Sequence, residues 1–278
     1  MLIGSNSFAG SSFAKYLLDK KYKVLGVSRS AEPKSIYLPY RKSKNLKNFK
    51  FVKINLNKNK DLDLLINLVK KNRIKYIVNF AAQGMVEESW IKPEDWYNTN
   101  VTSNSKLINR LSKLKINKYL NFTTPEVYGN TSDQIKENNN FSPSTPYAIS
   151  RACQDMNLLA YWKFNNFPVV FTRAANIFGP YQQLYRIVTK TIISAKNNIK
   201  LDLHGGGSSI RSFIFIEDVN TALIKILFDP KNIGQTYHIS TNKFISIKNL
   251  VSLILKTLKA KRNLIKIVNE RKGKDHGY

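Results

Sequence analysis

The sequence contains one cysteine, three histidines and only 18 acidic residues in a chain of 278. A single cysteine, Cys153, excludes a disulfide framework and any zinc site built from several cysteines. His204, His238 and His276 are too far apart in sequence to suggest a set of metal ligands, so we expect no metal site. Long apolar runs are also missing: no stretch of 18 apolar residues occurs, and no signal-peptide pattern opens the chain. These absences predict a cytoplasmic protein without a membrane span.

The scarcity of acids leaves a large positive charge. Lysine and arginine total 45, which gives a formal net charge of +27 at pH 7. One interpretation is a nucleic acid or an anionic surface as partner, because such a field attracts polyanions. The other is a general enrichment in lysine, which the spacing favours, since the lysines recur singly or in pairs and form no basic block. We therefore expect no specific nucleic-acid binding, although an anionic small substrate would be attracted.

No internal repeat, low-complexity segment or Pro/Gly/Ser-rich linker divides the chain. Short apolar runs alternate with amphipathic segments of helical length, which is typical of a doubly wound parallel sheet. The expected strands are 22–27, 51–56, 76–80, 119–123 and 168–172, and the expected helices include 11–20, 61–71 and 103–113. The sequence therefore predicts an α/β, Rossmann-like fold with an NAD(P)-binding domain over 1–175. A smaller substrate-binding lobe is expected over 176–278, with some segments returning to the main domain.

The first ten residues have the pattern of a strand, a tight turn and a helix start. Gly4 permits the turn and Gly10 permits a close approach of helix and strand, while Ser7 stands where a glycine is usual. Backbone amides between Gly4 and Gly10, including that of Phe8, would face a pyrophosphate at the helix N-terminus. Small residues are also common at helix starts without any ligand, so both interpretations stay open here.

Arg29 lies at the end of the second expected strand. Proteins that prefer NAD carry an acid at this point for the ribose 2′-hydroxyl, whereas an arginine accommodates a 2′-phosphate. The cofactor is therefore expected to be NADP or NAD, with NADP slightly favoured. The alternative is a solvated loop arginine in a strongly basic protein.

Tyr147 and Arg151 are four residues apart in an expected helix and so share one face. A cation beside a phenol stabilises the phenolate and lowers its pKa, which would make Tyr147 a base near neutrality. Such a pair is often simple surface packing, but here it follows Thr124 and Glu126 at the end of a strand. This order favours a catalytic role.

Taken together, these motifs resemble the extended short-chain dehydrogenase/reductase family of nucleotide-sugar enzymes, of the epimerase/dehydratase type. The similarity is greatest to the dTDP-glucose and GDP-mannose 4,6-dehydratases and covers nearly the whole chain. The segments that carry it are Gly4–Gly10, Asn79–Gln83, Ser89 followed by Pro93, Asn98–Val101, Thr124–Gly129, Tyr147–Arg151, Arg173–Pro180 and Arg211–Val219.

The resemblance implies a dehydration with an internally recycled nicotinamide. Thr124 would hydrogen-bond the sugar 4-hydroxyl, and Tyr147 would take its proton while C4 gives hydride to the cofactor. The resulting ketone acidifies the C5 proton, which Glu126 would remove as water leaves C6. Hydride would then return to C6. Tyr147 and Arg151 would also contact the cofactor.

The resemblance also implies binding residues and a homodimer. Ala81, Ala82 and Gln83 would line the cofactor groove, and Asn176 and Arg211 would contact the diphosphate of a nucleotide hexose. A role in nucleotide-sugar metabolism and polysaccharide biosynthesis would follow.

Three residues depart from the family pattern. Arg151 replaces a lysine and is a poor proton relay because of its high pKa. Pro125 replaces the acid that protonates the leaving hydroxyl in the dTDP-glucose type, and Asn55 replaces an aspartate that meets the adenine amino group. The first strand and the C-terminal end are also short, which suggests a minimal lobe or a truncated chain. The departures leave two alternatives open, an epimerase or decarboxylase of the same family and a non-catalytic binding protein that retains the fold.

Overall fold

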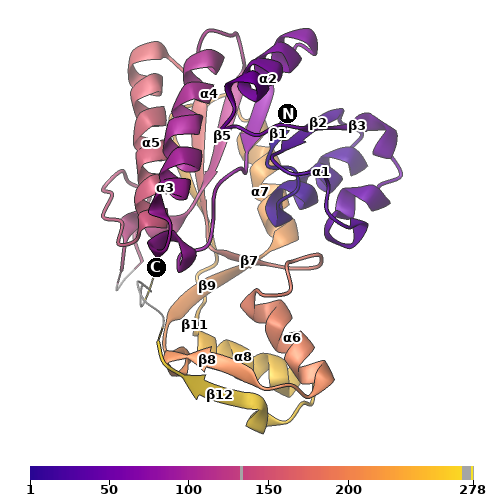
Figure 1. Cartoon of the computed structure of the whole chain (residues 1–278), viewed down its shortest axis with the longest axis vertical. Helices are drawn as coiled ribbons and strands as arrows, with labels where there is room; N and C mark the ends of the chain where they lie inside the picture. Colours follow the sequence, from indigo (N-terminus) through magenta and orange to yellow (C-terminus); the bar gives the residue numbers. More distant parts are fainter. Residues whose placement is uncertain (132–133, 271–276, 278) are drawn as a thin grey trace.

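The computed structural model describes residues 1–131, 134–270 and 277. A large domain with a central parallel sheet lies above a smaller lobe (Figure 1). The seven strands of the large sheet are β1 (Leu2–Ile3), β2 (Val24–Ser28), β3 (Phe49–Lys53), β4 (Tyr76–Asn79), β5 (Lys118–Thr123), β6 (Val169–Ala174) and β10 (Thr236–Ile239). Their order is β10-β6-β5-β4-β1-β2-β3, and every neighbouring pair is parallel. The predicted fold class is confirmed.

Helices cover both faces of this sheet and bury one apolar core on each. On one face, α1 (Phe8–Asp19) packs against α7 (Ile216–Phe228). On the other, α4 (Asn104–Leu111) contacts both α2 (Asn59–Lys71) and α5 (Pro146–Asn165). The strand order reverses between β1 and β4, which is the switch point where ligands bind in open α/β sheets.

The smaller lobe contains two short sheets and two helices. The first sheet joins β7 (Asn176–Phe178), β9 (Ile210–Phe215) and β11 (Phe244–Ser246), and the second pairs β8 (Leu201–His204) with β12 (Ile265–Val268). Helices α6 (Ile187–Asn197) and α8 (Ile247–Thr257) pack on each other. Between these elements, α7 and β10 run back to the large sheet.

None of the helices in the described ranges has both the length and the apolar character needed to cross a bilayer. Within the same ranges, no three potential ligands among histidine, cysteine and acidic side chains lie together as a metal site would require. His276 lies outside the described residues.

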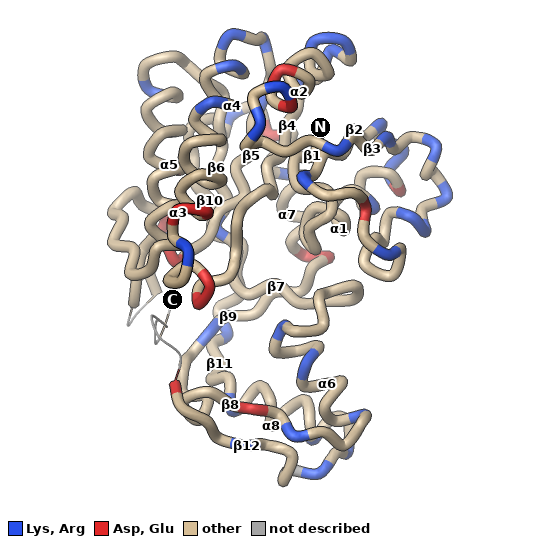
Figure 2. The backbone as a smooth tube through the Cα atoms, in the orientation of Figure 1, with Lys and Arg blue, Asp and Glu red and all other residues tan. Residues whose placement is uncertain are grey.

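Charge is unevenly distributed between the two ends of the sheet. Figure 2 shows basic segments at the upper end of the large domain and around β2 and β3, whereas acidic segments lie around α3 (Pro93–Trp96). Thirteen lysines and arginines but two acids occupy the segments that precede strands, namely 19–23, 43–48, 70–75, 112–117, 163–168 and 229–235. Seven basic and five acidic residues occupy the described segments that follow strands, namely 29–35, 54–60, 80–92, 124–131, 134–145 and 175–186. The lysines that are scattered in sequence therefore gather at the edge opposite the switch-point end.

A buried ion pair joins α5 to β6 inside the large domain. The guanidinium Nη2 of Arg173 lies 3.4 Å from Oδ2 of Asp155, and both side chains are fully buried. The amide of Asn121 on β5 donates to the other carboxylate oxygen at 2.9 Å. Burial raises the pKa of Asp155, while Arg173 and Arg151 act in the opposite direction. The pair thus ties one helix to two strands.

We expect Asp155→Ala to lower the free energy of unfolding by about 3–5 kcal/mol, because it leaves the Arg173 charge buried without its partner. Asp63→Ala is the matched control, since Asp63 pairs with Arg110 at 3.2 Å on the surface, and it should cost less than about 1 kcal/mol. Chemical denaturation followed by circular dichroism measures both. Equal losses of stability in the two variants would show that the buried Arg173–Asp155 pair matters no more for stability than the surface pair.

Candidate active site

The turn between β1 and α1 packs closely against neighbouring backbone. Gly4 has φ +83°, and a Cβ built there would lie 2.7 Å from the amide nitrogen of Ala81. A Cβ at Gly10 would overlap the carbonyl of Gly4. Ser7 caps α1: its Oγ accepts from the N–H of Gly10 at 3.0 Å and donates to the Gly4 carbonyl at 2.7 Å. The ring of Phe8 is buried in the core.

The loop after β4 is held by buried amides. Asn79 Oδ1 accepts from the N–H of Ala81 at 3.0 Å. Asn100 bonds both backbone groups of Gln83, with the N–H donating at 2.7 Å and the carbonyl accepting at 3.0 Å. Ala82 lies exposed between them. These contacts fix the backbone of residues 81–83 beside Gly4. Both asparagines lie in segments that carry the family resemblance, but the sequence did not indicate this supporting role.

Arg29 and Asn55 lie in the segments that follow β2 and β3. Arg29 is exposed, and its Nη1 donates to Oε1 of Gln83 at 3.3 Å, which links the loops after β2 and β4. The amide oxygen of Asn55 accepts from the N–H of Asn57 at 3.1 Å and so shapes its own turn. Its backbone N–H donates to Asp61 at 2.6 Å.

The predicted catalytic side chains lie where α5 begins beside the end of β5. Thr124 caps the short 3-10 turn Pro125–Tyr128, and its Oγ1 accepts from the N–H of Glu126 at 3.3 Å. The hydroxyl of Ser89 accepts from the N–H of Tyr147 at 3.2 Å. Arg151 is buried and donates from Nη2 to the carbonyl of Phe122 on β5 at 2.5 Å. Thr124, Glu126, Tyr147 and Arg151 are thereby brought together. Ser89 is one of the residues that carry the resemblance, and its role as a support for Tyr147 was not predicted.

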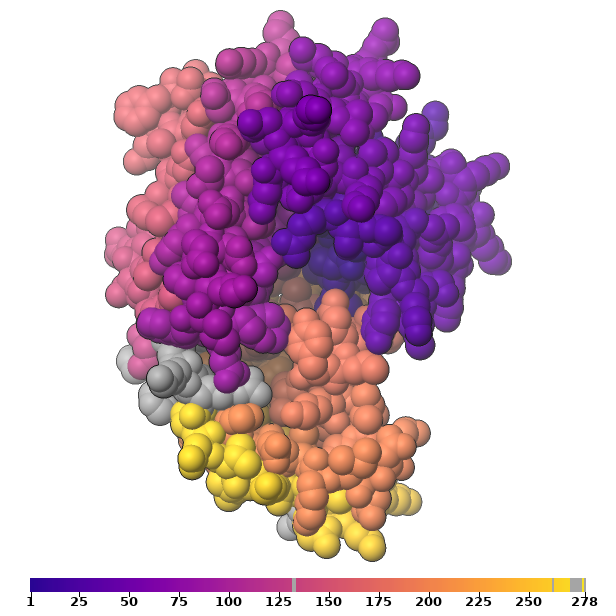
Figure 3. All heavy atoms as spheres, in the orientation of Figure 1, coloured from indigo at the N-terminus to yellow at the C-terminus, as the bar shows by residue number. Residues whose placement is uncertain are grey.

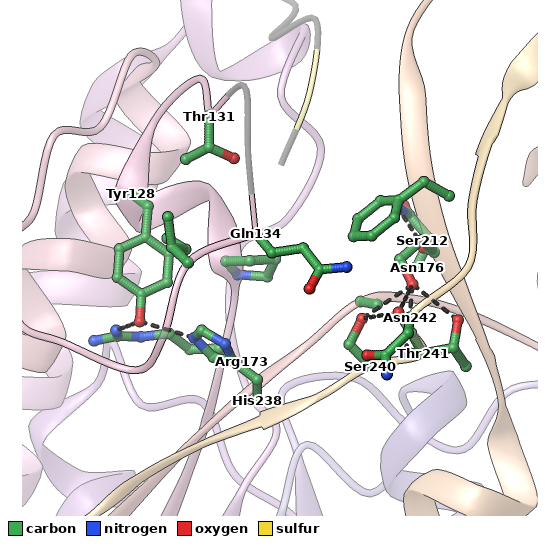
Figure 4. Close-up of a pocket in the computed structure, with 14 residues that line it drawn as sticks. Tyr128, Thr131, Gln134, Arg173, Asn176, Ser212, His238, Ser240, Thr241 and Asn242 are labelled. Carbon is green, nitrogen blue, oxygen red and sulfur yellow. Dashed lines mark hydrogen bonds between the residues drawn. The ribbon is translucent and has the colours of Figure 1, made fainter.

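A cavity of about 230 Å³ lies next to this cluster, between the large domain and the lobe. The space-filling view shows the surface hollowed between these two parts of the chain (Figure 3). The cavity is lined mainly by hydroxyl, amide and aromatic side chains from both parts, including Pro125, Tyr128, Gln134, Asn176, Ser212, His238, Thr241 and Asn242 (Figure 4).

Of the two predicted diphosphate contacts, Asn176 lines the cavity and donates to the carbonyl of Ser212 at 3.3 Å. Arg211 precedes Ser212 on β9 and donates from Nη1 to the carbonyl of Ile210 at 2.8 Å. Gln134 and Asn242 also line the cavity but come from loops, where no sequence pattern identified them.

Comparison with known proteins agrees with this architecture. A family model described as GDP-mannose 4,6 dehydratase matches residues 1–276. The chain belongs to this family. The predicted resemblance to sugar-nucleotide 4,6-dehydratases is confirmed.

Three known relatives match between 84% and 100% of the chain. The low-salt glycan biosynthesis protein Agl12 of Haloferax volcanii is 29% identical over 285 residues, covering 100% of this chain and 88% of that protein. The human dTDP-D-glucose 4,6-dehydratase is 31% identical over 241 residues, covering 84% of this chain and 68% of its own length. The dTDP-glucose 4,6-dehydratase DesIV of Streptomyces venezuelae, solved with NAD and TYD bound, superposes with a TM-score of 0.88 at 25% identity. That superposition covers 100% of this chain and 86% of DesIV.

The electrostatics of Tyr147 differ from the expectation drawn from its spacing to Arg151. Burial raises the pKa of the Tyr147 phenol, and the negative charge of Glu126 raises it further. Arg151 and a hydrogen bond from Thr124 lower it, but the net pKa shift is upward. The expectation that the arginine makes Tyr147 a base near neutrality is therefore wrong for the chain by itself, because burial and Glu126 outweigh the guanidinium.

We expect Glu126→Gln to lower the pKa of Tyr147, because it removes the negative charge that opposes the phenolate. Arg151→Met should raise that pKa, since it removes the stabilising cation. Titration of tyrosine ring-labelled protein by NMR, with the Tyr147 signal assigned from Tyr147→Phe, measures both shifts. Shifts of the same sign in the two variants would contradict this electrostatic account.

Proposed function

We propose that this chain is a nucleotide-sugar 4,6-dehydratase, a lyase that converts a nucleotide-diphosphate hexose into the 4-keto-6-deoxy sugar and water. The observation that carries the proposal is the cluster of Thr124, Glu126, Tyr147 and Arg151 beside the switch point of the sheet, in a chain of this family. Tyr147 can accept the proton of a hydroxyl group, and Glu126 can accept a proton from carbon. The two side chains are close enough that the charge of Glu126 shifts the pKa of Tyr147. That pairing suits oxidation at C4 followed by elimination across C5 and C6.

The residues around the β1–α1 turn fit a nicotinamide dinucleotide. Glycine at positions 4 and 10 keeps this turn tight, because a Cβ at either would overlap neighbouring backbone, and the first amides of an α-helix have no acceptor within the helix. Within the described part of the chain, the buried Nε of Arg151 has no hydrogen-bond acceptor, which leaves a donor for a ribose hydroxyl. When bound, the oxidised nicotinamide supplies the hydride acceptor for C4 and a positive charge that favours the Tyr147 phenolate.

Tyr147 takes the proton of the sugar 4-hydroxyl, and Thr124 orients that hydroxyl. The main-chain N–H of Tyr147 is held by Ser89, so the start of α5 cannot swing away from the loop that carries Ser89. Arg151 acts on the phenol as a positive charge, and its hydrogen bond to the Phe122 carbonyl holds the guanidinium in place. It stabilises phenolate without relaying a proton.

Glu126 then removes the proton from C5, which the 4-ketone has made acidic. Its position in the 3-10 turn is set by the cap that Thr124 provides, so the residue that orients the hydroxyl also positions the base. Asn176 and Arg211 bind the diphosphate, and the strong positive charge of the chain favours such an anionic substrate.

Removal of the two proton acceptors should block different steps. Tyr147→Phe prevents oxidation at C4, so the nicotinamide stays oxidised and no ketone forms. Glu126→Gln permits oxidation but blocks loss of the C5 proton, so reduced nicotinamide and a 4-keto hexose accumulate together. Each variant should lose about 10²–10⁴-fold in turnover. Single-turnover absorbance of the reduced nicotinamide, with mass spectrometry of the sugar, separates the two blocks.

Arg151→Lys serves as the conservative control, because it keeps a cation beside the phenol, and it should preserve or increase turnover. If Glu126→Gln dehydrates its substrate at the wild-type rate, elimination does not depend on that carboxylate. An epimerase or decarboxylase outcome would then replace the dehydratase. Absence of ketone formation with every nucleotide hexose would instead support a non-catalytic binding protein.

The cofactor is NAD or NADP, and Arg29 favours NADP because its guanidinium lies at the end of β2, where a 2′-phosphate would reach. Arg29→Asp should weaken NADP binding by at least about tenfold and leave NAD binding equal or stronger. Calorimetric titration of both cofactors measures this, with Lys34→Asp as a control for a nearby loop charge. A wild-type preference for NAD that Arg29→Asp does not change would refute the assignment.

The proposed assembly is a homodimer, and the proposed setting is cytoplasmic nucleotide-sugar metabolism that supplies polysaccharide biosynthesis. Ile149, Cys153, Met156 and Ala160 recur at helical spacing on α5, and Ile149 and Met156 are exposed. An apolar stripe of this kind suits packing against the same helix of a second copy. No specific nucleic-acid partner is proposed, since lysine charge without base-reading side chains gives binding that falls steeply with salt.

A further inference from the structure

The edge of the large sheet opposite the candidate active site carries a strongly charged surface. This surface, the basic edge, consists of the thirteen lysines and arginines in the six segments that precede strands, where only two acids accompany them. The whole chain has 45 basic and 18 acidic residues, so the excess at this edge is larger than a general enrichment in lysine provides. All thirteen residues are exposed, and within the described ranges none of them forms a salt bridge. The basic edge therefore presents uncompensated positive charge to solvent.

Stabilisation of helix ends accounts for only part of this charge. A cation in the last turn of an α-helix interacts favourably with the helix dipole. Lys70 and Lys71 lie in the last turn of α2, and Lys163 lies in the last turn of α5. The other ten basic residues lie outside the last turns of the α-helices that lead into these segments, so they have no such role.

Exposed aromatic side chains lie at the same edge. Phe164, in the last turn of α5, is 83% exposed, more than any other large apolar side chain in the described ranges. Tyr22 and Phe228 are also exposed, and their rings stack with centroids 5.5 Å apart, which joins the segment before β2 to the end of α7. Lysines near exposed aromatic rings are typical of proteins that bind an anionic bilayer, because the rings enter the interface while the ammonium groups meet the lipid headgroups.

A second cavity, of about 270 Å³, lies at this edge beside the starts of β2 and β3. Lys23, Lys47 and Lys50 line it together with Asn48 and Asn72, and the described residues around it include no acid. Ammonium and amide groups that surround a cavity in this way can donate hydrogen bonds to a phosphate group. The cavity is therefore suited to the phosphate of a lipid headgroup.

We propose that the basic edge is a docking surface for an anionic lipid bilayer. Phe164 enters the boundary between headgroups and acyl chains, the lysines contact the headgroups, and the second cavity holds a headgroup phosphate. A bilayer is favoured over a nucleic acid because twelve of the thirteen basic residues are lysines, which act as point charges, whereas nucleic-acid recognition favours the planar fork of arginine.

Docking at this edge keeps the candidate active site away from the bilayer. Figure 1 shows α5 running from the site to the upper end of the large domain. Tyr147 and Phe164 lie near opposite ends of this helix, which places the phenol about 25 Å from the proposed membrane contact at 1.5 Å per residue. Docking is thus independent of the proposed reaction and is measured by binding alone.

Co-sedimentation of the full chain with vesicles tests the role of charge. The chain should bind vesicles made of equal parts phosphatidylglycerol and phosphatidylcholine, should bind far less to phosphatidylcholine alone, and should dissociate as salt is added. The double variant Lys113→Gln/Lys115→Gln should bind about 30-fold more weakly, because each lysine near the surface contributes about fivefold. The double variant Lys58→Gln/Lys92→Gln is the matched control: it removes the same charge from segments that follow strands and should stay within about twofold of the wild type.

The same assay tests the apolar anchor. Phe164→Ser should weaken binding to the anionic vesicles by at least about tenfold, because it removes a ring that the bilayer would bury. Ile91→Ser is the matched control, since Ile91 is 73% exposed in the segment after β4, and it should bind like the wild type. Equal thermal midpoints for the variants and the wild type would exclude misfolding as the cause of a loss.

Three results would overturn the assignment of the basic edge. The first is an equal loss of vesicle binding in the two double lysine variants, which would reduce the effect to net charge. The second is unchanged binding by Phe164→Ser. The third is binding of a short DNA duplex as tight as that of the anionic vesicles and with the same dependence on Lys113 and Lys115, which would assign the edge to a nucleic acid.

Discussion

Helix α5 is fixed against strand β5 by buried polar contacts, and the geometry of the site depends on them. Arg151 donates to the carbonyl of Phe122, and one helical turn further on, Asp155 accepts from Asn121 and pairs with Arg173. At the start of the same helix, Ser89 holds the N–H of Tyr147. A shift of α5 along β5 would break all of these contacts at once. The phenol of Tyr147 is therefore positioned by interactions that extend well beyond the residues expected to touch a substrate.

The replacement of the family's lysine by Arg151 and of its acid by Pro125 changes how charge is arranged around the site. An arginine keeps its charge at every relevant pH, so the pKa of Tyr147 is set by the balance of burial, Glu126 and a fixed cation. The proline closes one side of the cavity without an acid, while His238 enters the same cavity from β10. Neighbouring strands of the large sheet therefore bring other polar groups to the same cavity.

The parts of the site that depend on local spacing could be predicted from sequence. The turn from Gly4 to Gly10, the strands of the large sheet other than β10, and the shared helical face of Tyr147 and Arg151 follow from short-range patterns. The direction of the Tyr147 pKa shift could not be predicted, because burial and the charge of Glu126 arise from tertiary packing. The contact between His238 and Tyr128 could not be predicted either, because the two residues are 110 positions apart in the sequence. The concentration of lysines and arginines at one edge of the large sheet could not be predicted from the sequence either, because six separate segments contribute to it.

In the proposed reaction, hydride removed from C4 of the sugar returns to C6 of the same molecule after water is lost. The direct measurement uses a panel of nucleotide hexoses labelled with deuterium at C4, with mass spectrometry and NMR of the product. This account predicts a 4-keto-6-deoxy sugar that has lost one water and carries the deuterium at C6. A product of unchanged composition with inverted C4, or a dehydrated product that has lost the label, would contradict it.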